Sequence, residues 1–155
     1  MTNPFMARAI ELAMENVRSG RGGPFAAVVV DQDRVVATGT NIVTSANDPT
    51  AHAEIVAIRA ACAALKTFRL EECEIYTTCE PCPMCLGAIY WARLRAVYFG
   101  ATAVDAAAAG FDDAFIYKQV ALRAEERSVP FQSMMREQAL LCFREWLAKA
   151  DRVAY

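Results

Sequence analysis

The feature that most constrains the fold of this chain is its single histidine, His52, because the side chains that could bind a metal ion with it lie about 30 residues further along the sequence. Glu54 follows two residues later, and a Pro-Cys-x-x-Cys run places Cys82 and Cys85 just after Pro81. Imidazole nitrogen and thiolate sulfur are ligands that zinc prefers in proteins. One zinc ion can use all three side chains only if the fold brings the two segments together.

The composition is that of a globular protein. The 155 residues are 55% hydrophobic and 22% charged, which favours one domain with a proper core. The net charge is −2 and the basic residues are scattered, so we expect no nucleic-acid partner. No apolar run reaches the ~18 residues of a membrane span, and the N-terminus lacks a signal-peptide pattern. We therefore expect no membrane association and a cytoplasmic location, with the six cysteines as reduced thiols or metal ligands.

Hydrophobic periodicity predicts a mixed α/β fold. The helix expected over 4–18 has Asn3 as its N-cap and Pro4 at its first position. Its apolar face is expected to hold Phe5, Ala9, Leu12, Ala13 and Val17. Further helices are expected at 50–65, 81–93, from 114 and at 136–150, and strands at 24–30, 34–42, 74–79, 96–100 and 128–135. Residues 43–49 are expected to be a loop, and Pro130 puts the last strand at an edge. The chain is thus predicted to be a single domain over 1–155, with helices on both faces of a mixed five-stranded sheet.

The alternation of strands and helices from 34 to 100 predicts that the zinc ligands meet at one edge of the sheet. Helices in open α/β sheets begin at the carboxyl ends of the strands, so His52 and Glu54 open one helix beside Cys82 and Cys85, which open the next. Cysteines three apart share a helix face, and the positive potential of helix N-termini favours thiolates. Three protein ligands leave a position for a water, whose pKa zinc lowers toward about 7 to give a hydroxide. Glu54 would shuttle the proton from that water to a departing amine, which is typically worth ~10²–10⁴-fold.

Other interpretations of the cysteines stay open. Cys-x-x-Cys is also typical of a redox pair, and Cys79 precedes Cys82 at the same spacing. Cys79 could also complete a closed structural zinc site, which would leave Glu54 without a role. The catalytic arrangement is favoured because Cys79 belongs to the preceding strand. The cysteines expected to be small core residues are Cys62, Cys73 and Cys142.

His-x-Glu followed by Pro-Cys-x-x-Cys is the signature of zinc nucleobase deaminases, and the resemblance extends beyond these residues. The segments TSANDPTAHAEIVAIR, YTTCEPCPMCLGAIYWAR and AGFDDAFIYK resemble the bacterial guanine deaminases of the cytidine-deaminase fold. This resemblance implies a three-layer α/β/α architecture and one Zn²⁺ per subunit. It also implies hydrolysis of guanine to xanthine and ammonia, in purine salvage or catabolism.

The same resemblance implies a set of base contacts. Asp113 is expected to accept N–H donors from the amidine edge of guanine, although Asp at this place is also typical of a helix cap. Asn41 is expected to bind a base edge through its amide, with a simple turn role as the alternative. Phe25 is expected as an aromatic wall of the pocket, and Ala53 is expected to line it.

Two further aromatic residues bear on the subunit arrangement. Trp91 either stacks on the base or faces a neighbouring subunit. Tyr155 is the last residue, and in the family that this chain resembles the C-terminal segment completes the pocket of the partner subunit. Tyr155 over the partner's base would make the protein an obligate homodimer, whereas the alternative is a frayed terminus.

Other functions would share the same zinc residues. A deaminase of cytosine, isocytosine or a triazine would differ only in its pocket contacts. The HAE and PCxMCxGAI patterns also recur in tRNA adenosine deaminases, which need a basic surface where this chain has acidic GFDD and mixed REWLAKADR. A non-catalytic zinc scaffold is disfavoured by Glu54 and the open ligand position. Guanine is therefore the first expectation.

Overall fold

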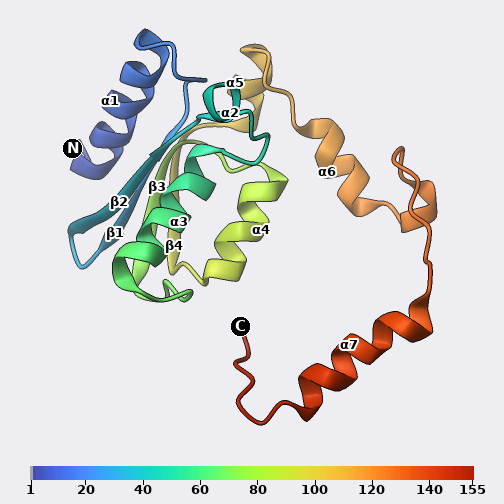
Figure 1. The fold of residues 1–155 in the computed structure, drawn as a ribbon. Helices are drawn as coiled ribbons and strands as arrows, with labels where there is room; N and C mark the ends of the chain where they lie inside the picture. Colours follow the sequence, from blue (N-terminus) through green and yellow to red (C-terminus); the bar gives the residue numbers. More distant parts are fainter. Residues whose placement is uncertain (1) are drawn as a thin grey trace. The chain divides into compact units, whose positions relative to one another are not determined.

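The computed structural model describes residues 2–155 and divides the chain into two compact units, one ending at Asp113 and one running from Ala114 to Tyr155 (Figure 1). The first unit is built on a sheet of β1 (Ala26–Asp31), β2 (Arg34–Thr40), β3 (Cys73–Cys79) and β4 (Ala96–Ala101). The strand order is β2-β1-β3-β4, with β1 antiparallel to both of its neighbours and β3 parallel to β4. The sheet is mixed, as predicted, and β2, β3 and β4 share one direction.

The sheet has four strands, so the prediction of five was wrong. The missing strand is the one predicted at 128–135, which is irregular in the structure. Its composition resembles a strand, but a strand exists only where a neighbour pairs with it, and Pro130 removes one of the N–H groups that such pairing needs. The prediction that residues 1–155 form one deaminase domain stays a prediction.

One face of the sheet is covered by α1 (Pro4–Arg18) (Figure 1). The helix begins as predicted, because the Asn3 side chain accepts hydrogen bonds from the N–H groups of Phe5 and Met6, both at 3.0 Å. Ala9 packs on this face with a buried cluster that includes Val28, Val30 and Tyr76. The predicted apolar face needs one correction: Val17 is half exposed, and Asn16 is the fully buried residue instead.

The opposite face is covered by α3 (Ala53–Leu65) and α4 (Pro83–Ala92) (Figure 1). Residues of β1 alternate between the two faces, so Ala27 and Val29 join the cluster beneath α3 while Val28 and Val30 join the one beneath α1. This arrangement confirms the three-layer architecture. Two short helices lie in the connections: α2 (Val43–Ala46), where a loop was predicted, and α5 (Ala103–Ala108).

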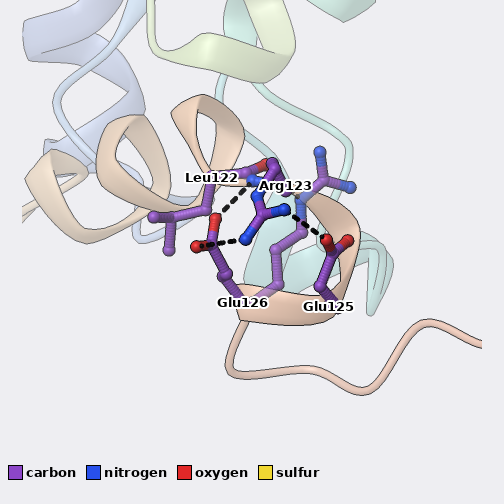
Figure 2. Close-up of polar contacts among 5 residues, drawn as sticks. Leu122, Arg123, Glu125 and Glu126 are labelled. Carbon is purple, nitrogen blue, oxygen red and sulfur yellow. Dashed lines mark hydrogen bonds and ion pairs between the residues drawn. The ribbon is translucent and has the colours of Figure 1, made fainter.

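The second unit contains α6 (Ala114–Ala121), a 3₁₀ turn η1 (Ala124–Glu126) and α7 (Arg136–Ala148). Figure 2 shows the polar contacts after α6, where the Arg123 guanidinium pairs with Glu125 and with Glu126, each at 3.0 Å. No residue from 114 to 155 is buried, so these exposed ion pairs hold the turn locally at little gain in stability. Across residues 2–155, no helix is both long and apolar enough to cross a membrane.

Candidate functional site

The predicted zinc ligands lie at the starts of α3 and α4. His52 is the N-cap of α3 with φ −67° and ψ 155°, and Cys82 is the N-cap of α4 with φ −66° and ψ 168°. Neither side chain makes a capping hydrogen bond to its own helix. Each side chain is therefore free of its own helix, and the two face one another across the gap between the helix starts.

The three ligand atoms lie at the spacing that a tetrahedral ion requires. Nδ1 of His52 is 3.5 Å from Sγ of Cys82 and 3.6 Å from Sγ of Cys85, and all three atoms lie within 4.8 Å of one another. Ligands bound at about 2.0–2.3 Å around a tetrahedral zinc are roughly 3.5 Å apart. Both the donor set and its geometry therefore fit Zn²⁺, as predicted.

The two ligand cysteines differ in how readily they lose a proton. The hydrogen bond between the two side chains, strengthened by His52, lowers the pKa of the Cys82 thiol to about 4. The same hydrogen bond raises the pKa of Cys85, and the bond to Cys82 raises the pKa of His52. Cys82 is thus the readier of the two to supply a thiolate, which is the metal-binding form of cysteine.

Glu54 lies in the first turn of α3 and is only 7% exposed. Burial raises the pKa of its carboxyl group, and the thiol of Cys85 and the ring of His52 are both close enough to act on it. A carboxyl group in a desolvated position with a raised pKa is suited to take up and release a proton near neutral pH. Its place beside the ligands fits the predicted proton shuttle.

The structure separates Cys79 from the ligand set. Its thiol lies 3.6 Å from the carbonyl oxygen of Thr102 and donates to it, and the group of ligand atoms found among residues 2–155 contains only His52, Cys82 and Cys85. The closed four-ligand arrangement is therefore not formed. The cysteines predicted to lie in the core behave differently from one another: Cys73 is buried, Cys62 is half-buried, and Cys142 is exposed, contrary to prediction.

Asn41 and Phe25 are joined to each other and to the histidine segment by backbone hydrogen bonds. The N–H of Asn41 donates to the carbonyl of Phe25 at 3.0 Å, and the next residue, Ile42, donates to the carbonyl of Ala51 at 3.1 Å. Ala51 directly precedes His52, and Ala53, 1% exposed, follows it. Backbone hydrogen bonds therefore connect the segments of Asn41 and Phe25 to the segment that holds His52, and Ala53 is the next residue after it.

Phe111 is a neighbour of the site that the sequence did not single out. Its ring meets that of Phe25 edge-on, with centroids 4.9 Å apart at 85°. The available signal was its place beside the acidic pair in GFDD. Asp113, two residues on, is half-buried, and burial followed by the negative charge of Cys82 raises the pKa of its carboxyl group. Asp113 therefore lies within electrostatic reach of the ligand cysteines.

The two remaining predicted residues are exposed aromatic side chains. Trp91 is near the C-terminal end of α4, the opposite end from Cys82, and is 68% exposed. Tyr155 ends the second unit and is also exposed.

Two parallel strand–helix turns that hold one histidine, two cysteines and a buried glutamate define a zinc-dependent deaminase site. Residues 2–101 match the family model for the cytidine and deoxycytidylate deaminase zinc-binding region, and the chain belongs to this family. Over 151 residues, 97% of each chain, it is 52% identical to the guanine deaminase of Bacillus subtilis (strain 168). The X-ray structure of guanine deaminase from Bacillus subtilis matches with a TM-score of 0.96 at 51% identity, covering 99% of both chains.

Two more distant relatives mark the limits of the similarity. A solved complex with 2,6-diaminopurine matches with a TM-score of 0.68 at 34% identity, over 97% of this chain and 83% of that one. The tRNA-specific adenosine deaminase of Agrobacterium fabrum (strain C58 / ATCC 33970) is 46% identical over 95 residues, 59% of this chain and 62% of that one. The similarity to the tRNA enzyme thus covers a smaller share of this chain than the similarity to the guanine deaminase.

Proposed function

We propose that this protein hydrolyses guanine to xanthine and ammonia. The observation that carries the proposal is the joined set of His52, Cys82, Cys85 and the buried Glu54, in a chain 52% identical to a guanine deaminase across 97% of its length. One water is consumed, its oxygen goes to C2 of guanine, and the 2-amino group leaves as ammonia.

His52, Cys82 and Cys85 would hold the Zn²⁺. When bound, this ion supplies a Lewis acid that lowers the pKa of a coordinated water toward about 7. Glu54 takes one proton from the attacking water and delivers it to the ring nitrogen. It then takes the second proton from the hydroxyl group now on C2 and delivers it to the departing amine, which leaves as ammonia. Its carboxyl group can do both because burial raises its pKa, which brings the group closer to the pH at which it works.

Four residues are proposed to bind the base. Asp113 accepts N–H donors from the guanine edge, Asn41 supplies an amide, Phe25 forms an aromatic wall and Ala53 lines the floor. The support for Asp113 is that the charge of Cys82 reaches its carboxyl group. The support for Asn41 and Phe25 is the hydrogen bond that joins them and the bond from Ile42 to Ala51 beside His52.

The test of the proposed substrate is ammonia release from guanine, cytosine, adenine and isocytosine by the purified zinc-loaded protein. Guanine should be turned over fastest by at least ~10-fold in kcat/KM, since a base that lacks the matching donors leaves Asp113 unpaired. Faster turnover of cytosine or isocytosine than of guanine would refute guanine as the preferred substrate. Asp113→Ala should lower kcat/KM for guanine by roughly 10-fold or more; a near-normal value would remove Asp113 from the pocket.

We further propose that two copies form a homodimer through residues 114–155. This unit has helices but no buried residue, whereas helices in water owe most of their stability to packing of an apolar face. Its apolar groove of about 350 Å³ is lined by Phe115, Ile116, Val120, Val129 and Phe131, among others. A second copy of the chain would cover this apolar surface. Trp91, which is exposed, is proposed to face the neighbouring subunit.

The dimer proposal also concerns Tyr155, which we place over the base in the partner's pocket. Deletion of Tyr155 should lower kcat/KM for guanine while the elution volume in size-exclusion chromatography stays that of a dimer. Unchanged turnover after the deletion would remove Tyr155 from the pocket. A monomeric wild-type protein at micromolar concentration would remove the dimer.

A further inference from the structure

Asn16 is a fully buried polar residue that the zinc chemistry does not use. It lies near the end of α1 and is 0% exposed. Its side-chain nitrogen donates two hydrogen bonds, one to the carbonyl of Gly23 at 2.9 Å and one to the carbonyl of Asn41 at 2.8 Å. A single amide thus joins the turn after α1 to the chain that leaves β2.

The two carbonyls belong to the segments proposed to bind the base. The carbonyl of Gly23 also accepts the N–H of Phe25 at 2.9 Å, and the carbonyl of Phe25 accepts the N–H of Asn41 at 3.0 Å. The amide of Asn16 therefore closes a ring of hydrogen bonds around Phe25 and Asn41. The side-chain oxygen of Asn41 in turn accepts the N–H of Val43 at 3.3 Å. The orientation of the Asn41 side chain therefore depends on the position of the backbone that Asn16 holds.

The surroundings require an amide at position 16. A Cβ on Gly22 would lie 2.0 Å from the carbonyl oxygen of Asn41 and 3.2 Å from the Asn16 side-chain nitrogen, so Gly22 leaves the space in which this bond forms. The orientation of the amide is fixed, because its reversal would point an oxygen at two carbonyl oxygens. The Oδ1 of Asn16 has no hydrogen-bond partner in the described part of the chain. Burial of an amide oxygen without a hydrogen-bond partner is unfavourable, and the two hydrogen bonds that the amide nitrogen donates offset that cost.

We propose that Asn16 is a positioning residue that fixes Asn41 for the base without touching it. This inference rests on the proposed function, since it takes Asn41 to be a base contact. Asn16 acts from the α1 side of the sheet, whereas His52 and Glu54 belong to α3 on the other side. Its loss should therefore weaken base binding and leave the zinc ligands and the proton shuttle in place.

The expected result is a selective change in KM. A contact that binds substrate and transition state alike raises KM with little change in kcat when it is lost. Asn16→Ala should raise KM for guanine roughly 3- to 10-fold, the worth of one hydrogen bond, with kcat within about 2-fold and zinc content unchanged. A drop in kcat at constant KM would overturn the proposal.

A double-mutant cycle with Asn41→Ala tests whether Asn16 acts through Asn41. In the Asn41→Ala background, Asn16→Ala should change KM by less than about 2-fold. Independent, multiplicative effects would overturn the proposal. If Asn16→Ala does not fold, Asn16→Ser serves in the same cycle, because its single hydroxyl can donate to at most one of the two carbonyls and brings no charge into the buried position.

Ala9→Gly is the matched control for a loss of stability in α1. Ala9 is buried on the same helix and packs beside Val28 and Tyr76, away from the two carbonyls. The Ala9→Gly variant should lower the melting temperature and leave KM unchanged. A rise in KM equal to that of Asn16→Ala would show that Asn16 matters only through stability and would overturn the proposal.

Failure of the proposed function is separate, because it would appear as no ammonia from guanine with the wild-type protein. The cycle is then run with the base that the wild type does deaminate.

Discussion

Gly39 in β2 packs directly against the backbone of α3, and the variant Gly39→Ala tests this contact. An added Cβ would lie 2.3 Å from the carbonyl oxygen of Ala53 and 2.5 Å from the backbone nitrogen of Ala57. Both atoms belong to the backbone of α3, so neither can move as a flexible side chain would. The first turns of α3 must retreat by roughly 1 Å to reach ordinary contact.

The substitution is expected to lower both the melting temperature and kcat. Overpacking of a well-packed core costs about 1–3 kcal/mol, and this clash against backbone lies at the upper end. At about 2–4 °C per kcal/mol for a chain of this size, the melting temperature should fall by roughly 6–12 °C. Because α3 also carries His52 and Glu54, and a misplacement of about 1 Å can cost ~10²-fold in rate, kcat should fall by up to that factor.

Gly87→Ala is the matched control. Gly87 lies inside α4, and an added Cβ there would meet nothing within 4 Å. Alanine in a helix interior is more stable than glycine by about 0.8–1 kcal/mol, so the melting temperature should rise by roughly 2–4 °C. Calorimetry, guanine turnover and zinc content are measured on both variants. If Gly39→Ala melts with the wild type, α3 does not rest on β2 as described, and the reasoning fails.

Three further predictions concern the metal, the proton shuttle and a helix cap. Glu54→Gln should keep its zinc and its melting temperature but lose ~10²–10⁴-fold in kcat, and normal turnover by metal-replete protein would refute the shuttle. Removal of zinc with a chelator should lower the melting temperature, since an ion at 100 times its Kd stabilises by about 2.7 kcal/mol; added Zn²⁺ should restore it, and the double variant Cys82→Ser/Cys85→Ser should not respond to either treatment. Thr102→Ala should destabilise the protein by about 0.5–2 kcal/mol in urea unfolding, because the Thr102 side chain and Asp105 form a reciprocal capping box at the start of α5. Thr102→Ser keeps the hydroxyl and should unfold like the wild type; equal losses in both variants would show that the methyl group, not the cap, is what matters.

The arrangement of the strands explains why a short motif was so informative. Because β1 is antiparallel to both β2 and β3, these two strands run in the same direction, and the helices that follow them begin at the same edge of the sheet. The separations of 3.5 and 3.6 Å from His52 show that the predicted ligands meet there. The base contacts have no comparable geometric check, so Asp113, Asn41 and Phe25 stay predictions, whereas His52, Cys82 and Cys85 converge with the spacing that a zinc ion would need.

The sequence alone determined the local features of this protein. It specified the start of α1 at Asn3 and the helices that open beside His52 and Cys82, because capping and periodicity act between residues near one another in the chain. It also specified the candidate ligand set, because few residue types bind zinc and the chain has a single histidine. Only the tertiary structure decided which strands pair, so it placed β1 between β2 and β3 and left residues 128–135 without a partner. It also turned Cys79 toward Thr102 and buried Asn16 in place of Val17. These outcomes depend on contacts between distant segments, which no local pattern encodes.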